Sequence, residues 1–316
     1  MKWIVASLLG LVAFFSGCTT VPETGRKQLS LVPNDQIEQM AISQFQQLKQ
    51  QSNVSQDPEM NAQLQRVGRR IARQAEQYMP NTQWEFVVID EDVVNAFAMP
   101  GGKVAFYTGI FPLFESDDDV AIVMGHEISH VIARHGAERV SQQLAVAGIG
   151  VGLGIALNDE DEGTKRAVLA AYGMGTTIGY LLPYSRGHES EADKIGLKLA
   201  ARAGYDPRRA IPFWEKMASE GGARPPAFLS THPTPETRIQ RLSELMPEAM
   251  AEYNAATSNN SGDLTIDVPP ATIRRPDYDT SSDQQGYQIR RQGEIQTTTG
   301  QQDNNYGVQD KSAYGQ

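Results

Sequence analysis

The strongest constraint on this chain is a pair of histidines four residues apart in an apolar segment, in the sequence His126-Glu127-Ile128-Ser129-His130. Ser116, followed by a run of aspartates, is a favourable helix start, so we predict one helix from Ser116 to about Val140. Four residues turn a helix by about 400°, which puts both imidazoles on one face. Two buried imidazoles at this spacing can bind one tetrahedral metal ion, so the fold must bury this helix beside further ligands.

The residues around the two histidines suggest a division of roles. Glu127 is turned about 100° from His126 and can lie beside a metal without binding it, as a general base does. A catalytic zinc takes a third protein ligand and keeps water as its fourth. On one continuous helix, His135 lies about half a turn from His126 and points to the opposite face. We therefore expect the third ligand elsewhere in the chain.

Residues 189–193 (Glu-Ser-Glu-Ala-Asp) supply the best candidate, within a helix predicted from about Glu189 to Ala203. Glu189 and Asp193 are four residues apart and share a face, whereas Glu191 is about 200° from Glu189. We expect Glu189 to bind the metal and Asp193 to orient a ligand histidine. Glu191 is expected to be a solvated helix charge. His188 is a rival ligand, but it would face elsewhere on the helix.

The start of the chain has the pattern of a secretory signal. We predict a signal peptide over residues 1–17, because a basic residue, an apolar run from Ile4 to Phe15 and small residues precede Cys18. The apolar run is too short to span a bilayer, which takes about 20 residues. Cys18 is the only cysteine, and its surroundings resemble the lipobox of bacterial lipoproteins, with Phe15 where leucine is usual. We expect lipidation of Cys18 and anchoring to the membrane; a plain signal peptide is the alternative. The same resemblance implies that a residue other than Asp after the cysteine, here Thr19, favours the periplasmic face of the outer membrane.

Composition divides the remaining chain. We predict an anchor linker and N-terminal helix over 18–55, the main folded domain over 56–253 and a disordered polar tail over 254–316, because the tail has too little apolar surface to offset its ordering entropy. The net charge of −10 excludes a nucleic-acid partner held by phosphate contacts.

Periodicity and turn residues predict an α+β fold, mainly helical with a small mixed sheet. Two Gly-rich apolar segments, 144–157 and 167–182, are expected to form core helices of a hairpin near the site, or else an element that touches a membrane or gates substrate. The other expected elements are helices at 34–48, 58–78, 206–217 and 235–253, strands at 84–89, 93–98 and 103–107, and an edge strand near 29–32.

The two helical motifs together resemble the HtpX/LoiP/BepA-type gluzincin metallopeptidases, which are related to the CAAX prenyl endopeptidases. The resemblance covers about residues 21–246. Further matching segments are Asn95-Ala96-Phe97, Ser185-Arg186, Thr231-His232-Pro233 and Arg238.

The resemblance implies one Zn²⁺ per chain, bound by His126, His130 and Glu189, with Glu127 as general base. It places Asp193 behind the ligands. A second set of residues is implied to face substrate or the active site: Asn95, Ala96, Phe97, His232 and Arg238. Either of the last two can stabilise the developing oxyanion, or His232 can cap the zinc and keep the enzyme latent. An extended peptide would bind along the strand that contains Asn95.

We therefore expect a lipid-anchored zinc metalloendopeptidase with a gluzincin core. Its expected substrates are misfolded, misassembled or stalled envelope proteins, with the outer-membrane assembly machinery as a possible partner. Two alternatives stay open: a hydrolase of a cell-wall amide, and a periplasmic chaperone or assembly factor with latent protease activity.

Overall fold

The computed structural model describes residues 18–158, 161–176, 182–220, 226–232 and 237–260. The expected signal peptide and all but the first residues of the expected polar tail lie outside this part of the chain. Part of the second Gly-rich segment, residues 177–181, lies outside it as well.

A three-stranded mixed sheet lies at the centre of the fold. Its strands are β3 (Glu85–Ile89), β4 (Ala96–Met99) and β5 (Lys103–Tyr107), in the order β3-β5-β4. β3 runs parallel to β5 and β4 antiparallel to it. Gly101 and Gly102 make the tight turn between β4 and β5, both with positive φ (80° and 72°), which glycine adopts without strain. Because β4 is last in the strand order, it is an edge strand of the sheet.

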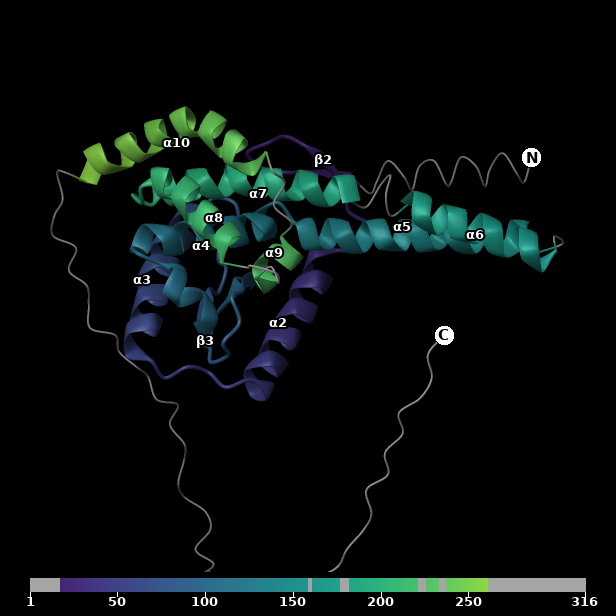
Figure 1. Cartoon of the computed structure of the whole chain (residues 1–316), viewed down its shortest axis with the longest axis horizontal. Helices are drawn as coiled ribbons and strands as arrows, with labels where there is room; N and C mark the ends of the chain where they lie inside the picture. The colour runs from purple at the N-terminus through teal and green to yellow at the C-terminus, as the bar shows by residue number, and fades with distance from the viewer. Residues whose placement is uncertain (1–17, 159–160, 177–181, 221–225, 233–236, 261–316) are drawn as a thin grey trace, which may run out of the picture. The chain divides into compact units, whose positions relative to one another are not determined.

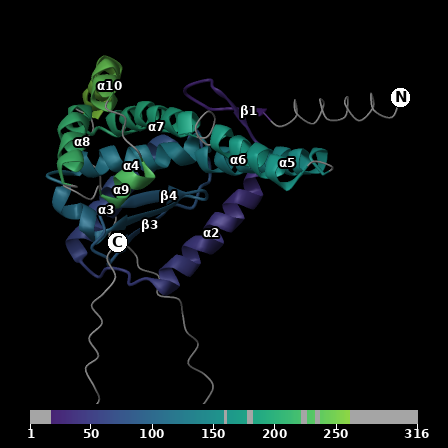
Figure 2. The same ribbon diagram turned by 45° about the vertical axis from the view of Figure 1, so that its right-hand side comes forward.

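Helices cover both faces of this sheet (Figures 1 and 2). On one face, the main core combines strand side chains such as Phe86 and Phe106 with α3 (Pro58–Ala75) and α4 (Asp117–Ile132). On the other face, Phe45 of α2 (Asn34–Gln51) packs on a smaller cluster of strand residues. The predicted mainly helical α+β fold is confirmed.

The helix predicted to run from Ser116 to Val140 is broken in the middle. α4 begins at the Ser116 cap as expected but ends at Ile132. Arg134 then takes a left-handed backbone conformation (φ 56°), and α5 (His135–Ala156) starts in a new direction. A left-handed residue cannot continue an α-helix, so side-chain directions on α4 cannot be extrapolated to His135.

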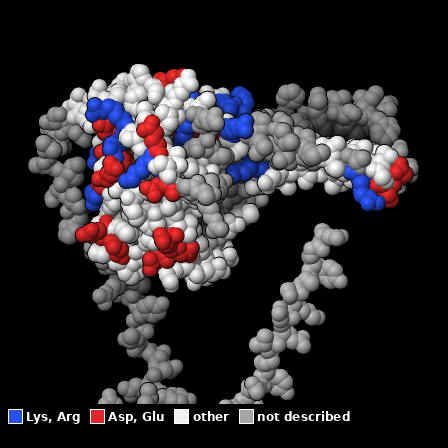
Figure 3. All heavy atoms as spheres, in the orientation of Figure 1, with Lys and Arg blue, Asp and Glu red and all other residues white. Residues whose placement is uncertain are grey.

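α5 forms a hairpin with α6 (Glu162–Thr176), and the Tyr172 hydroxyl donates to the Val146 carbonyl oxygen at 2.8 Å. The large apolar side chains of α5 from Leu144 onward do not lie in the core: Leu144 is 53% and Ile155 72% exposed. The expectation of core helices is therefore wrong for this segment. Figure 3 shows a largely uncharged surface here, with charges gathered at the far end. No helix in the described ranges is long and apolar enough to cross a membrane.

Of the remaining elements, α7 (Leu182–Arg202), α8 (Ala210–Ser219) and η3 (Pro207–Arg209) contact α4, and α10 (Arg238–Asn260) packs on α7 and α8. α7 crosses α4 and begins earlier than predicted. The others are η1 (Thr108–Leu113) and α9 (Ala227–Thr231). α10 continues past its expected end near Tyr253, and the Thr257 hydroxyl donates to the Tyr253 carbonyl oxygen at 2.9 Å.

The chain before α2 forms a small ribbon. β1 (Cys18–Thr20) pairs antiparallel with β2 (Lys27–Leu29), so the expected edge strand lies slightly earlier than predicted. We call residues 18–29 the N-terminal ribbon. It packs on α5, and the backbone N–H of Leu31, just after it, donates to the Ser141 hydroxyl at 2.9 Å.

Candidate metal centre

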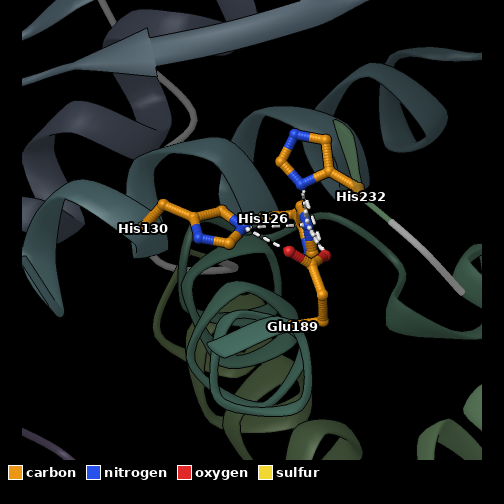
Figure 4. Close-up of side chains that lie close together, drawn as sticks. All are labelled: His126, His130, Glu189 and His232. Atoms are coloured by element: carbon orange, nitrogen blue, oxygen red, sulfur yellow. Dashed lines mark hydrogen bonds and ion pairs between the residues drawn. The ribbon is translucent and has the colours of Figure 1, made fainter. Parts of the chain in front are cut away.

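Four side chains from three helices converge at one point: His126 and His130 of α4, Glu189 of α7 and His232 at the end of α9 (Figure 4). One ligand atom from each residue lies within 4.8 Å of every other. The first three side chains are buried and His232 is partly exposed.

The distances between these atoms fit a tetrahedral zinc site. His126 Nε2 lies 3.2 Å from His130 Nε2 and 3.3 Å from Glu189 Oε2. His232 Nδ1 lies 3.4 Å from His126 Nε2 and 3.3 Å from Glu189 Oε2. Ligands bound at zinc–nitrogen distances of about 2.0–2.1 Å stand about 3.3 Å apart at the corners of a tetrahedron. Three imidazoles and a carboxylate are also the donor types that zinc prefers.

The other ring nitrogen of His126 is held from behind. Its Nδ1 lies 3.0 Å from Asp193 Oδ1, and the Arg238 guanidinium donates to the same carboxylate oxygen. Arg238 is 2% exposed and its guanidinium carbon lies 3.6 Å from the centre of the Trp214 ring. Arg238 thus lies on the Nδ1 side of His126, away from the convergent atoms. The expectation that Arg238 faces the cleft and stabilises an oxyanion is not supported; the geometry suits support of Asp193.

Glu127 points into the cleft beside the cluster without being one of the four convergent side chains. Its Oε1 is buried without a hydrogen-bond partner among the described residues and lies 3.5 Å from His232 Nε2. Burial raises the pKa of this carboxyl, partly offset by the nearby His232 and His126. A carboxylate with a raised pKa and a free oxygen can accept a proton from water and release it again.

The ionisation of the ligands reflects their crowding. Burial disfavours the charged form of His126, but its hydrogen bonds to Asp193 and Glu189 outweigh burial and raise its pKa to about 9. His130 has a pKa well below the usual value because it is buried and lies near other imidazoles. Glu189 is also buried, yet its histidine partners hold its pKa far below the usual range. The carboxylates of Glu189 and Asp193 thus favour positive charge at His126.

His232 is placed by the short helix α9. Its backbone N–H donates to the Phe228 carbonyl oxygen at 2.8 Å, and the Phe228 ring stacks on its imidazole with centroids 4.5 Å apart. The Phe228 backbone N–H donates in turn to the Val94 carbonyl oxygen at 3.0 Å, just before β4. These contacts place His232 at the fourth corner of the cluster.

A cleft of about 460 Å³ opens beside the metal ligands. Glu127, His130 and His232 lie in its wall, together with Phe97 and Ala98 of the edge strand β4. Of the three residues expected to bind substrate, Phe97 alone lines this cleft. Ala96 is 1% exposed, because strand alternation turns its side chain into the core, and the side-chain oxygen of Asn95 is buried without a partner among the described residues.

Three residues that the sequence analysis did not assign to the site lie close to its ligand histidines. Glu191 is not a solvated charge: it is 7% exposed, and its Oε2 lies 2.9 Å from His135 Nε2. His135 does not face away, since its Nδ1 lies 2.8 Å from His130 Nδ1. Burial lowers the pKa of His135 to about 4, against its bond to Glu191. His188 is stacked on His135 with ring centroids 4.1 Å apart, and is not one of the convergent ligands. The break at Arg134, invisible to helical periodicity, accounts for the error on His135.

The H-E-x-x-H helix lies beside a sheet edge, and a glutamate from a second helix joins its two histidines in a group that could hold a metal. This arrangement is typical of zinc metallopeptidases. Residues 58–246 match the model of peptidase family M48. The chain belongs to this family, and zinc is its cofactor.

Named relatives agree with the family. The mitochondrial metalloendopeptidase OMA1 of Schizosaccharomyces pombe is 35% identical over 79% of this chain and 74% of its own length. The beta-barrel assembly-enhancing protease of Escherichia coli is 32% identical over 86% of this chain and 60% of its own length. OMA1 of Arabidopsis thaliana is 37% identical over 60% of this chain, but only 38% of that protein is covered. The chain is thus a metalloprotease similar to parts of longer relatives.

Proposed function

We propose that this metalloprotease is an endopeptidase of the bacterial cell envelope that cleaves misfolded or stalled envelope proteins. The observation that carries the catalytic part is the buried Oε1 of Glu127, which has no hydrogen-bond partner among the described residues and lies in a cleft beside four convergent ligand atoms. Peptide bonds are favoured over cell-wall amides because the family and its named relatives are peptidases.

We assign the metal to His126, His130 and Glu189. When bound, zinc polarises the scissile carbonyl and lowers the pKa of water. Glu127 would take a proton from the attacking water as the water oxygen bonds to the carbonyl carbon. It would deliver that proton to the amine nitrogen as the C–N bond breaks, and its raised pKa favours this transfer. Asp193 accepts the Nδ1 hydrogen of His126 and so fixes which nitrogen faces the metal.

Substrate binding is proposed along β4. Within the described ranges this strand pairs with β5 alone, so the main-chain groups on its other side can pair with an extended peptide. Phe97 and Ala98 lie along the cleft. Main-chain pairing is tolerant of sequence. It therefore suits substrates defined by being unfolded, rather than by a particular sequence.

His232 supports a latent resting state. With His232 in place the four convergent side chains complete a tetrahedron, as in closed zinc sites, whereas a catalytic zinc keeps one position for water. We propose that His232 withdraws before cleavage. The closed set also favours the second candidate function, an assembly factor in which cleavage is rare.

The proposed location rests on Cys18 and on one group of relatives. Cys18 is exposed at the start of the N-terminal ribbon, where a lipid can be attached. The Escherichia coli relative is named for β-barrel assembly, whereas the OMA1 relatives are mitochondrial by name. The lipobox pattern and the first group favour the outer membrane.

The test compares the mature chain carrying Cys18→Ser with the same chain carrying Glu127→Gln. Both are expected to bind about one zinc, and wild-type Glu127 alone should support cleavage of unfolded casein. Equal cleavage by both would contradict the catalytic assignment. Zinc binding with no cleavage by either would favour the assembly factor.

A further inference from the structure

A chain of buried hydrogen-bonding groups runs from His130 to the N-terminal ribbon. His130 Nδ1 lies 2.8 Å from His135 Nδ1, and His135 Nε2 lies 2.9 Å from Glu191 Oε2. His135 is completely buried. Each of its ring nitrogens therefore has one partner and no access to bulk water.

The donor and acceptor of each hydrogen bond in this series can be assigned from the carboxylate at its end. An ionised carboxylate only accepts hydrogen bonds, so His135 donates to Glu191 through its Nε2–H. A neutral imidazole carries one hydrogen, so His135 Nδ1 accepts, and the donor must be the Nδ1–H of His130. His130 is then left with its lone pair on Nε2, the atom that faces His126 and Glu189.

The N-terminal ribbon holds the Glu191 end of this series of hydrogen bonds. Arg26 donates from Nε to Glu191 Oε2 at 2.9 Å, and the Thr24 hydroxyl donates to the other oxygen of Glu191. Arg26 also donates from Nη1 and Nη2 to the two oxygens of Glu138, at 3.0 and 2.8 Å. These ribbon residues precede the segment 58–246 that matches the family model.

We infer that His135 is a positioning residue that sets the tautomer and ring orientation of His130. Glu191 and Arg26 hold His135 in that role, so the N-terminal ribbon belongs to the support of the metal centre and not only to a linker. This inference rests on the ligand set proposed above. It gives the second ligand histidine a carboxylate-backed partner, as Asp193 gives one to His126.

His188 provides a built-in control. It belongs to the same buried network, with Nε2 2.8 Å from Glu138 Oε2 and its ring stacked on His135, but the path from Glu191 to His130 does not pass through it. His188→Phe keeps an aromatic ring against His135. His135→Phe keeps the ring but removes both nitrogens from the path.

The experiment measures zinc affinity by chelator competition on the mature chain carrying Cys18→Ser. We expect His135→Phe to weaken zinc binding by about 10- to 100-fold. His135→Asn, which restores an acceptor near His130, should recover much of this loss. His188→Phe should weaken zinc binding less than His135→Phe does, because His188 lies off the path to His130. Equal affinities for the parent and His135→Phe would overturn the inference. Failure of the parent itself to bind zinc would instead contradict the ligand set.

A second measurement keeps the inference testable if His135→Phe does not fold. Nitrogen-15 NMR of the zinc-loaded parent is expected to show hydrogen on Nδ1 of His130 and on Nε2 of His135, with His135 Nδ1 bare. Arg26→Met, at a partly exposed side chain, should weaken zinc binding in the same direction as His135→Phe. The opposite tautomers, or full zinc affinity in Arg26→Met, would overturn the proposed path.

Discussion

Gly125 of α4 and Gly196 of α7 touch backbone to backbone. A Cβ on Gly125 would lie 2.6 Å from the Gly196 carbonyl oxygen, and a Cβ on Gly196 would lie 2.7 Å from the His126 backbone nitrogen. This crossing brings His126 against Glu189 and Asp193, because those two residues lie on the same face of α7 as Gly196. The metal centre thus depends on the absence of two side chains.

We predict that Gly196→Ala separates the two helices. Overpacking at this contact should lower the free energy of unfolding by about 1–3 kcal/mol and weaken zinc binding, because the ligands of α4 and α7 no longer converge. Chemical denaturation and chelator competition measure the two effects. Gly152→Ala on α5 is the matched control, since nothing lies within 4 Å of its added Cβ. Equal behaviour of the two variants would contradict the account of the crossing.

Asp193→Asn tests the support of His126. The amide can keep one hydrogen bond but removes the negative charge that favours the Nδ1–H of His126, so zinc affinity should fall by about 10- to 100-fold. Cleavage measured at saturating zinc should recover in part. Asp161→Asn, an exposed acid at the far end of the α5–α6 hairpin, should leave zinc affinity unchanged.

His232→Ala separates capping from catalysis. If His232 fills the fourth metal position at rest, its removal opens that position to water and casein cleavage should rise several-fold while zinc affinity falls. The measurement is the initial rate of casein cleavage at fixed zinc occupancy. Unchanged or reduced cleavage would argue against latency and leave His232 with a role in stabilising the reacting carbonyl oxygen.

Glu23 ties the N-terminal ribbon to the body of the protein, and this tie should depend on pH. Burial raises its pKa, but hydrogen bonds from Tyr78 and Arg202 and the charge of Lys198 prevail and lower it from 4.5 to about 2. A lowered folded-state pKa stabilises the fold above about pH 4.5, and the contribution disappears as pH falls towards 2.

Glu23→Gln should therefore reduce the free energy of unfolding at pH 7 by about 1–2 kcal/mol, less than full linkage because the network is partly solvent-exposed. The difference from the parent should shrink between pH 4.5 and 2. Urea denaturation across this range measures it, with Glu220→Gln, at an exposed position, as control. A difference that is constant over this range would contradict the assignment.

Helical periodicity was sufficient to predict which side chains share a face where a helix is regular. It predicted that His126 and His130 share a face and that Glu189 and Asp193 do, and the structure brings these four side chains together. The resemblance also pointed to His232, which the structure places with the ligands.

Periodicity failed where a backbone break or a distant partner decides the outcome. Arginine is not a residue type that favours the left-handed conformation, so nothing in the sequence indicated the helix break at Arg134. The direction of the His135 side chain could therefore not be predicted. The burial of Glu191 depends on Arg26, 165 positions earlier in the chain, which no local pattern reveals. The exposure of α5 was likewise hidden, because apolar content alone does not say whether a helix has a neighbour.

The central claim is that one zinc ion is held by His126, His130 and Glu189 beside Glu127. Anomalous diffraction at the zinc edge, from crystals of the zinc-loaded chain, tests it most directly. We expect a single strong peak about 2.0–2.2 Å from His126 Nε2, His130 Nε2 and a Glu189 carboxylate oxygen. A zinc peak elsewhere, or one that does not contact Glu189, would contradict it.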